Sequence, residues 1–304
     1  GFTWPERLEE AESRVAELEG EIEARGKLAN ISEAVKNCDK CGNDVAQYCS
    51  LCLGAAVAHV ARQLDDAESA LRAADAEVHY QHHMTANWVP EAAEVRRQRC
   101  FGVFTLVGST GPWPRVVNIW EYESWADLAH NFGFELDSPG HRDPMLESWW
   151  AEAASFRSGG IDRILVGGDH NPGVEHWQSR GGTGMVAYAH EVIGVVPGTA
   201  RAVADAIGRS AAEATAGSAH APLTLVGLWH TAMRADDQVV ALWGIPDWPT
   251  WAAFEESCVG NPARHRGLTS LERTLLVDAD LSPLRIGRQP TAADRRPMEE
   301  FDPG

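Results

Sequence analysis

The sequence predicts an α+β fold in which one βαββαβ unit occurs twice, behind a helical hairpin that a metal ion holds at its tip. Three observations indicate this: four cysteines within fifteen residues, heptad-spaced apolar residues on both sides of them, and a pattern after residue 79 that recurs further along the chain. At 304 residues and 44% hydrophobic content, the chain is long enough for roughly two ordinary domains with sizeable cores.

The overall charge excludes two classes of partner. The formal net charge is -18, which repels nucleic-acid phosphates and anionic lipid, and the short basic run around Arg96 and Arg97 is typical of a solvated helix face. No run of about eighteen apolar residues indicates a membrane span or a secretory signal. The six cysteines include two CxxC pairs, which fits a reducing compartment, so we expect a cytoplasmic protein without nucleic-acid or membrane partners.

Residues 1–77 are predicted to form an antiparallel hairpin of two coiled-coil helices. Each seam alone buries too little apolar surface to hold a single helix in water, so the two helices are expected to pack against each other. The first seam repeats every seven residues at Leu8, Val15, Ile22 and Ala29. The second seam alternates steps of three and four residues through Val57, Val60, Leu64, Ala67, Leu71, Ala74 and Val78.

Residues 38–52 form the tip of this hairpin and carry a predicted metal site. Cys38, Cys41, Cys49 and Cys52 follow a CxxC-x7-CxxC spacing, in which each pair can offer two thiolates to one ion. Four thiolates leave no open coordination position, so we expect a structural zinc ion that holds the hairpin rather than a catalytic metal. An iron–sulfur cluster or a redox dithiol pair are the alternatives.

The rest of the chain contains an internal repeat. Thr105-Leu-Val-Gly108 recurs as Thr224-Leu-Val-Gly227, and Val116-Val-Asn-Ile-Trp120 recurs as Val239-Val-Ala-Leu-Trp243. From those tryptophans onward, the offset stays at 123 through Trp125 and Trp248 to Pro139 and Pro262. A match at several anchors in one register predicts a duplicated unit.

Each copy is predicted to have the ferredoxin-like order βαββαβ. The domains are expected at 78–167 and 185–280, with a glycine-rich linker at 168–184 and an extended tail at 281–304. The second copy is divided into strand 185–196, helix 198–216, strands 222–231 and 238–245, helical region 247–273 and strand 274–279. The first copy is divided into strand 78–86, helix 90–99, strands 101–109 and 115–122, helical stretch 124–157 and strand 161–166. Two sheets, each with one bare face, should pack into a pseudo-dimeric α+β barrel.

Residues 78–280 resemble the NIPSNAP branch of the dimeric α+β barrel superfamily. The resemblance rests on the order of several motifs. A strand ends in Val196-Pro-Gly198 and is followed by a helix, and a later strand contains a tryptophan. After this tryptophan come Trp-x-x-Phe and then Asn-Pro. The residues concerned are Trp243, Trp251, Phe254 and Asn261-Pro262, with Trp120, Trp125 and Ser138-Pro139 in the first copy. The resemblance implies a cleft for a small, rather apolar molecule, and an activity among cofactor-free monooxygenases, isomerases and lyases, but no shared catalytic residue.

Five residues of the predicted barrel strands are candidates for acid–base or orienting roles. Tyr80 and His82, like Tyr188 and His190, are two residues apart, so on a strand each pair would point to the same face. Asn118 shares a face with Trp120 in the same way. Histidine is the natural proton shuttle near neutral pH. The alternative is a set of structural histidines retained in both copies.

His141 is a sixth candidate, because the two copies differ there. Pro139-Gly-His141-Arg142 in the first copy stands against Pro262-Ala-Arg264-His265 in the second. A Pro-x-His before an amphipathic helix resembles the proximal haem-ligand segment of the haem-containing aldoxime dehydratases, which implies haem as an alternative cofactor.

We therefore expect an enzyme that transforms a small hydrophobic or aromatic molecule in the barrel, of cofactor-free oxygenase, isomerase or lyase type. The zinc hairpin would mediate self-association or docking to a protein partner. Two alternatives remain at this point: a non-catalytic scaffold that interacts through the hairpin, and a haem-dependent enzyme on the same barrel.

Overall fold

The computed structural model describes residues 79–90, 96–112, 115–136, 144–154, 159–215, 222–259 and 267–295, with Ala76 and Ala92. Apart from Ala76, these residues belong to one compact unit, Glu77–Phe301. The predicted hairpin, its four cysteines and His141 lie outside the described residues.

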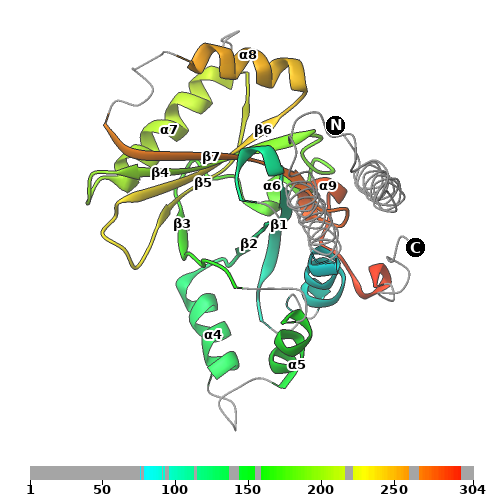
Figure 1. Ribbon diagram of the computed structural model, residues 1–304. Coiled ribbons are helices and arrows are strands. Elements are labelled where there is room, and N and C mark those ends of the chain that lie inside the picture. Colours follow the sequence, from blue (N-terminus) through cyan, green and yellow to red (C-terminus); the bar gives the residue numbers. More distant parts are fainter. Residues whose placement is uncertain are drawn as a thin grey trace, which may run out of the picture. The chain divides into compact units, whose positions relative to one another are not determined.

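Seven strands form one antiparallel sheet in the order β2-β1-β7-β4-β6-β5-β3. The fold class is therefore α+β, and the sheet curls so that one face is concave (Figure 1). The strands are β1 (Arg99–Leu106), β2 (Val116–Glu121), β3 (Leu165–Gly167), β4 (Ala187–Val195), β5 (Thr224–Thr231), β6 (Gln238–Ile245) and β7 (Leu268–Asp278). The helices are α4 (Trp125–Leu136), α5 (Pro144–Ala153), α6 (Val174–Gln178), α7 (Ala200–Thr215), α8 (Trp248–Cys258) and α9 (Pro283–Ile286). Three short elements complete the set: the π-helix His83–Trp88 and the 3-10 helices Gly108–Thr110 and Ala292–Asp294.

The second half of the chain has the predicted succession β4-α7-β5-β6-α8-β7. Its strands lie side by side in the order β7-β4-β6-β5. One boundary was wrong, because α8 ends at Cys258 and β7 begins at Leu268, inside the predicted helical region 247–273. The reason is pairing: β7 runs along β4 from Leu268 opposite Val195 to Leu276 opposite Tyr188, so these residues complete a long ladder.

The first half differs from the prediction at its start. Residues 79–90 are helical, so the predicted strand 78–86 was wrong, and the predicted helix 90–99 runs into β1. Tyr80, Met84 and Trp88 recur every fourth residue, and they pack together against Trp149 of α5 in one buried cluster. This spacing of four residues predicts a helix, but the strand was predicted instead because Tyr80-Gln-His82 matched Tyr188-Ala-His190 of the second copy. The tandem barrel of two complete units is therefore not what the described residues form.

The hairpins β1–β2 and β5–β6 are nevertheless built alike. Each has a register shift, between Cys100 and Gly102 in β1 and between Leu225 and Gly227 in β5. Cys100 pairs with Trp120, and Leu225 pairs with Trp243, so the two tryptophans occupy equivalent positions as their constant offset predicted. The repeated Thr-Leu-Val-Gly, in contrast, falls at the end of β1 and at the start of β5, and is out of structural register.

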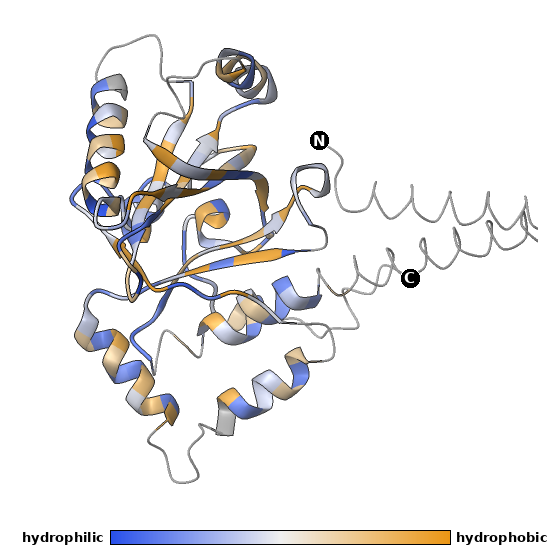
Figure 2. Ribbon diagram, turned by 60° about the vertical axis from the view of Figure 1, so that its left-hand side comes forward, coloured by the Kyte–Doolittle hydropathy of each residue, from blue (hydrophilic) through white to orange (hydrophobic). Residues whose placement is uncertain are grey.

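The outer face of the β4–β7 region is covered by α7 and α8. Alternation along β4 directs Ala187, Ala189 and Ile193 to this face. Beneath α7, Ala200 and Ala204 pack on residues of β4, β5 and β6. Beneath α8, the side chains of Trp248, Trp251 and Phe254 pack on β4, β6 and β7. Figure 2 shows apolar segments in the strands of the sheet and on the helices that cover it.

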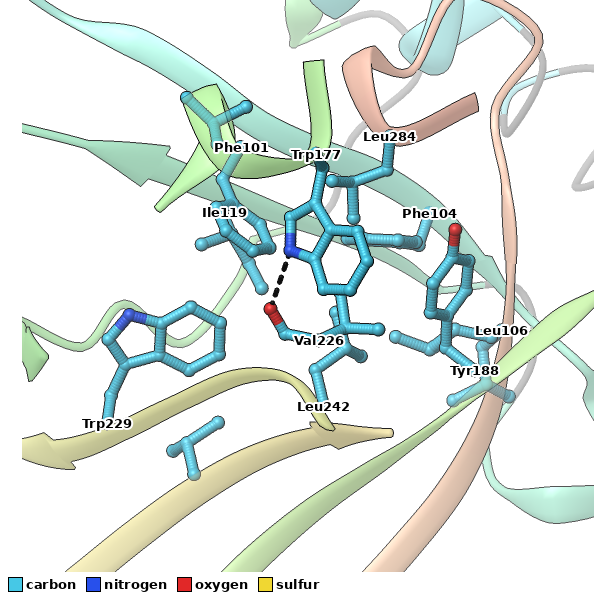
Figure 3. Packing of buried hydrophobic residues seen from close by; sticks show 13 residues of the cluster. Phe101, Phe104, Leu106, Ile119, Trp177, Tyr188, Val226, Trp229, Leu242 and Leu284 are labelled. Carbon is cyan, nitrogen blue, oxygen red and sulfur yellow. Dashed lines mark hydrogen bonds between the residues drawn. The ribbon is translucent and has the colours of Figure 1, made fainter. Parts of the chain in front are cut away.

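The concave face holds two short helices, α6 and α9, instead of a bare interior. Val174 and Trp177 of α6 and Leu284 of α9 belong to the same buried cluster as Phe104 and Leu242 of the sheet (Figure 3). The segment that was predicted to be a glycine-rich linker, 168–184, thus contributes a helix to the core. Part of the predicted extended tail does so as well, through α9.

A β-bulge fixes α6 in place. The register shift in β5 leaves Val226 without a partner in the ladder, and its carbonyl oxygen accepts a hydrogen bond from Trp177 Nε1 at 3.0 Å (Figure 3). Gly227 is required beside it, since a Cβ atom there would lie 2.0 Å from the ring of Trp229. At the other end of the helix, Val174 N donates to Glu121 Oε2 at 2.9 Å.

Among the residues that the structure describes, none of the helices has the length and apolar character needed to cross a membrane.

Candidate functional site

The predicted site residues fall on opposite faces of the sheet. Tyr188 and His190 of β4 face the concave side. Tyr80 and Asn118 lie in the outer layer near α5, and His82 is on the same helix as Tyr80. The expectation of one shared pocket was therefore wrong for the described residues. Tyr80 and His82 are on a helix, where residues two apart point in different directions, so the strand rule does not apply to them.

Tyr80 and Asn118 form a structural contact in the outer layer. Asn118 Nδ2 donates to Tyr80 Oη at 3.0 Å, while Asn118 Oδ1 is buried without a hydrogen-bond partner. Nearby, the buried ring of His83 stacks on Trp149 with 4.9 Å between ring centroids. Burial lowers the pKa of His83 below its ordinary value, against the opposing effects of Glu152 and the Trp149 carbonyl. These groups hold residues 79–90 on β1, β2 and α5.

Register places the concave-face pair of Tyr188 and His190. Tyr188 stands opposite Gly244 of β6 and Leu276 of β7, and His190 stands opposite Leu242 and Thr274. Directly opposed residues in an antiparallel ladder project to the same face. Tyr188, Leu276 and Leu242 all belong to the concave-face cluster, so His190 also projects there.

Tyr188 is hydrogen-bonded at the closed end of this face. Its hydroxyl donates to Asp278 Oδ2 at 2.6 Å and lies 2.5 Å from Thr183 Oγ1. Burial raises the pKa of Asp278 to about 6, even though hydrogen bonds from Tyr188 and Ser282 favour the ionised form. Burial and the nearby carboxylate also raise the pKa of Tyr188.

Asp278 was not predicted from the sequence. The signal was available, since it is an acidic residue that ends the apolar run Leu275-Leu-Val277 of a predicted strand. An acid in such a position is either exposed at the strand end or buried with a partner. Here its Oδ1 atom is buried without a hydrogen-bond partner of normal geometry, which makes the carboxyl group costly to ionise.

His190 differs from Tyr188 in having no partner. It makes no hydrogen bond or ion pair within the described part of the chain, and its side chain is only partly exposed. Burial, together with the positive charges of Arg163 and Arg115, lowers its pKa to about 4. The imidazole is therefore neutral at pH 7 and has a free nitrogen that can accept a proton.

The two arginines approach from separate loops. Arg163 precedes β3, and its Nε donates to Gln238 Oε1 at 2.9 Å at the start of β6. Arg115 precedes β2, and its Nη1 lies 3.9 Å from Glu272 Oε1 of β7. Gln238 pairs with Gly194 and Glu272 with Val192, so both arginines lie toward the end of β4 that follows His190.

The two ends of the concave face thus differ in character. At the Tyr188 end, Trp177 and Leu284 fill the space against Phe104 (Figure 3). At the His190 end lie the imidazole, which has no partner among the described residues, and the hydroxyl of Thr274. The guanidinium groups of Arg163 and Arg115 lie there too, with the amide of Gln238 and the carboxylate of Glu272 beside them. This arrangement can accept a proton and bind an anion. Within the described ranges, no group of three or more His, Cys, Asp or Glu side chains could hold a metal ion.

Comparisons with known proteins provide no family for the chain. No protein-family model matches it. No curated protein matches it either. Among solved structures, a crystal structure from Fusobacterium nucleatum subsp. nucleatum, provisionally named a monooxygenase, is similar with a TM-score of 0.37 and 11% sequence identity. The match covers 66% of this chain and 83% of that one, and similarity at this level carries no conclusion about activity.

Proposed function

We propose that the chain is an enzyme that moves a proton on a small, largely apolar molecule bound at the His190 end of the concave face. His190 accepts the proton. Isomerisation, elimination and cofactor-free oxygenation all begin with removal of a proton from carbon or from a phenol, so the proposal includes the reaction classes that we expected from the sequence.

One observation carries this proposal: within the residues that the structure describes, the partly exposed imidazole of His190 makes no hydrogen bond or ion pair. A buried polar group without a partner costs free energy, and most such groups in folded proteins are hydrogen-bonded. A structural histidine would have a partner, as His83 has in the carbonyl oxygen of Trp149 at 3.3 Å. A group that is left unsatisfied in the free protein but faces a partly open surface is suited to a ligand.

The low pKa of His190 limits its strength as a base. A base with a pKa of about 4 is a weak proton acceptor at pH 7, because catalytic efficiency is greatest when the pKa lies near the working pH. Removal of the two arginine charges, for example by an anionic ligand, would raise the basicity of His190. We therefore expect catalysis only when a substrate is bound that neutralises this end of the face.

A deuterium-exchange assay tests the proposal without knowledge of the natural substrate. The full chain in D₂O would be incubated with a panel of carbon acids whose uncatalysed C–H exchange is slow, including aryl ketones and cyclic ketones, some with and some without a carboxylate. We expect catalysed exchange for at least one member, with a loss of at least tenfold in His190→Gln and no change in His130→Gln, an exposed residue of α4. Exchange that is equal in wild type and His190→Gln would refute the role of His190.

The second candidate is a non-catalytic scaffold, and one observation favours it. Trp177 and Leu284 occupy the concave face where a barrel enzyme would need room, next to the fully buried Tyr188. If no member of the panel exchanges and no small molecule is retained in native mass spectra, the scaffold is the better description.

For both candidate functions, enzyme and scaffold, we propose the same role for the N-terminal segment. A structural zinc ion on Cys38, Cys41, Cys49 and Cys52 would hold a hairpin that mediates self-association or binds a protein partner. The haem alternative rests on His141, and metal and visible-absorption analysis of the purified chain distinguishes the two cofactors.

A further inference from the structure

We propose that the His190 end of the concave face recognises a single carboxylate group, carried by a small aromatic or alicyclic ligand, through Arg163 with Arg115 beside it. This inference rests on the proposed function for the location of the site, and it adds the chemical class of the ligand.

The first step of the argument is the charge of the site. Among the described residues, the charged groups near His190 come from three elements: Arg115 before β2, Arg163 before β3, and Glu272 on β7. Arg115 has a carboxylate neighbour in Glu272, whereas the only partner of Arg163 within the described residues is the neutral amide of Gln238. With His190 neutral, the local charge is close to one positive charge, which matches a monoanion better than a phosphate dianion.

The second step is hydrogen-bonding capacity. The Nε of Arg163 is used by Gln238, and within the described residues its terminal nitrogen atoms make no hydrogen bond, so they can act as a planar pair of donors. Two parallel N–H groups are the geometry that a carboxylate accepts in a bidentate contact. The imidazole of His190 provides a further polar contact from β4, which pairs with the strand β6 that carries Gln238.

The third step is the apolar part of the ligand. Across the ladder from His190 stands the buried Leu242, and the concave cluster continues through Val240 and Trp229 of the adjoining strands. A ligand whose carboxylate reaches Arg163 would lay its remaining atoms against this apolar surface. Apolar walls with a few placed polar groups are the usual composition of a small-molecule site.

The proposal also accounts for the unusual basicity of His190. Arg163 and Arg115 both disfavour the imidazolium form. A bound carboxylate offsets their charge and stabilises the imidazolium, so binding should raise the pKa of His190. The same ligand group would then both anchor the substrate and prepare the base.

The test uses the full chain and six probes: benzoate, phenylacetate, salicylate, cyclohexanecarboxylate, the neutral isostere benzamide and the dianion phenyl phosphate. Binding would be measured by titration calorimetry, and the pKa of His190 by NMR of histidine-labelled protein with and without the probe. The variants are Arg163→Gln, Arg163→Lys and the control Arg201→Gln, which removes an exposed arginine of α7.

We expect at least one carboxylate to bind at least tenfold more tightly than benzamide and phenyl phosphate. Arg163→Gln should weaken that binding at least tenfold, Arg163→Lys less, and Arg201→Gln not at all. Saturation should raise the pKa of His190 by about one unit or more. Equal binding of benzamide, equal binding by Arg163→Gln, tighter binding of phenyl phosphate, or no carboxylate binding below 10 mM would each overturn the inference.

The two proposals fail in different ways. If carboxylates bind as expected but His190→Gln retains full exchange activity, the ligand class stands and the catalytic role fails. If exchange depends on His190 but neutral and charged substrates react equally, the catalytic role stands and the ligand class fails.

Discussion

The pH dependence of stability should reveal the buried, neutral state of His190. Its pKa falls from the ordinary value of 6.5 to about 4 in the folded protein. Between these two values, the unfolded chain takes up a proton that the folded chain does not. The contribution of His190 is therefore fully present above about pH 6.5 and is lost as the pH falls toward 4.

The size of this effect follows from the pKa difference. A difference of about 2.5 in pKa corresponds to about 3 kcal/mol in the acid limit and to about 2 kcal/mol at pH 5. Asp278 titrates in the same range with the opposite sign, because its pKa rises from 3.8 to about 6. The difference between wild type and His190→Gln isolates the histidine, since both proteins contain Asp278.

The assay is urea unfolding of wild type, His190→Gln and the control His130→Gln at pH 8, 6.5 and 5. We expect the stability of His190→Gln relative to wild type to increase by about 2 kcal/mol between pH 8 and pH 5. His130→Gln should show no such change relative to wild type. If the difference between His190→Gln and wild type stays constant within about 0.5 kcal/mol over this range, His190 is not held neutral on the concave face.

Three further predictions concern the core, the buried acid and the metal. Trp177→Ala should lower the free energy of unfolding by about 3–5 kcal/mol. Trp177→Phe should lower it by only about 1–2 kcal/mol, because phenylalanine keeps most of the packing and loses only the hydrogen bond to the Val226 carbonyl. Equal losses for the two variants in chemical denaturation would contradict this prediction. Asp278→Asn should stabilise the protein by about 1–3 kcal/mol at pH 7, because the amide oxygen can still accept from Tyr188 and no buried charge remains; this gain should vanish near pH 4. Thermal unfolding measured across this pH range tests the prediction. A variant that is less stable than wild type at pH 7 would show that burial of the Asp278 carboxylate has no free-energy cost. Elemental analysis should find one zinc per chain, absent in Cys38→Ser and retained in Cys258→Ser, and a zinc-free wild type would remove the predicted clasp.

Part of the sheet could be predicted because its signals are local. The strands and helices of the second half follow from alternation, an alanine-rich helix and short turns, and all six elements are present in the predicted order. The constant offset between Trp120 and Trp243 correctly identified equivalent positions in two hairpins. Strands β4, β5 and β6 were predicted correctly because they are largely buried and form apolar runs. The first part of β7 is polar and more exposed, so it was assigned to the helical region before it.

The predictions failed where one segment is compatible with both a strand and a helix, or with both an exposed and a buried side chain. The segment 78–86 was predicted as a strand because Tyr80-Gln-His82 resembles Tyr188-Ala-His190. Tyr80, Met84 and Trp88 also share one face of a helix, and their packing against Trp149 stabilises the helical conformation. Asp278 was missed for a related reason, since only the curvature of the sheet shows that its carboxyl group is buried beside Tyr188.

By itself, the sequence determined which residues have acid–base chemistry to offer and, through strand alternation, that Tyr188 and His190 point the same way. Only the tertiary structure decided that Tyr80 and His82 lie in another layer and that Trp177 and Leu284 fill one end of the concave face. It alone also showed that His190 has two arginines near it and no partner in the part of the chain that is described. The physical reason is that periodicity is a property of a few neighbouring residues, whereas burial and charge depend on segments far apart in the chain that meet across one curled sheet: Arg115 and His190 are 75 residues apart, and Trp177 and Leu284 are 107 apart.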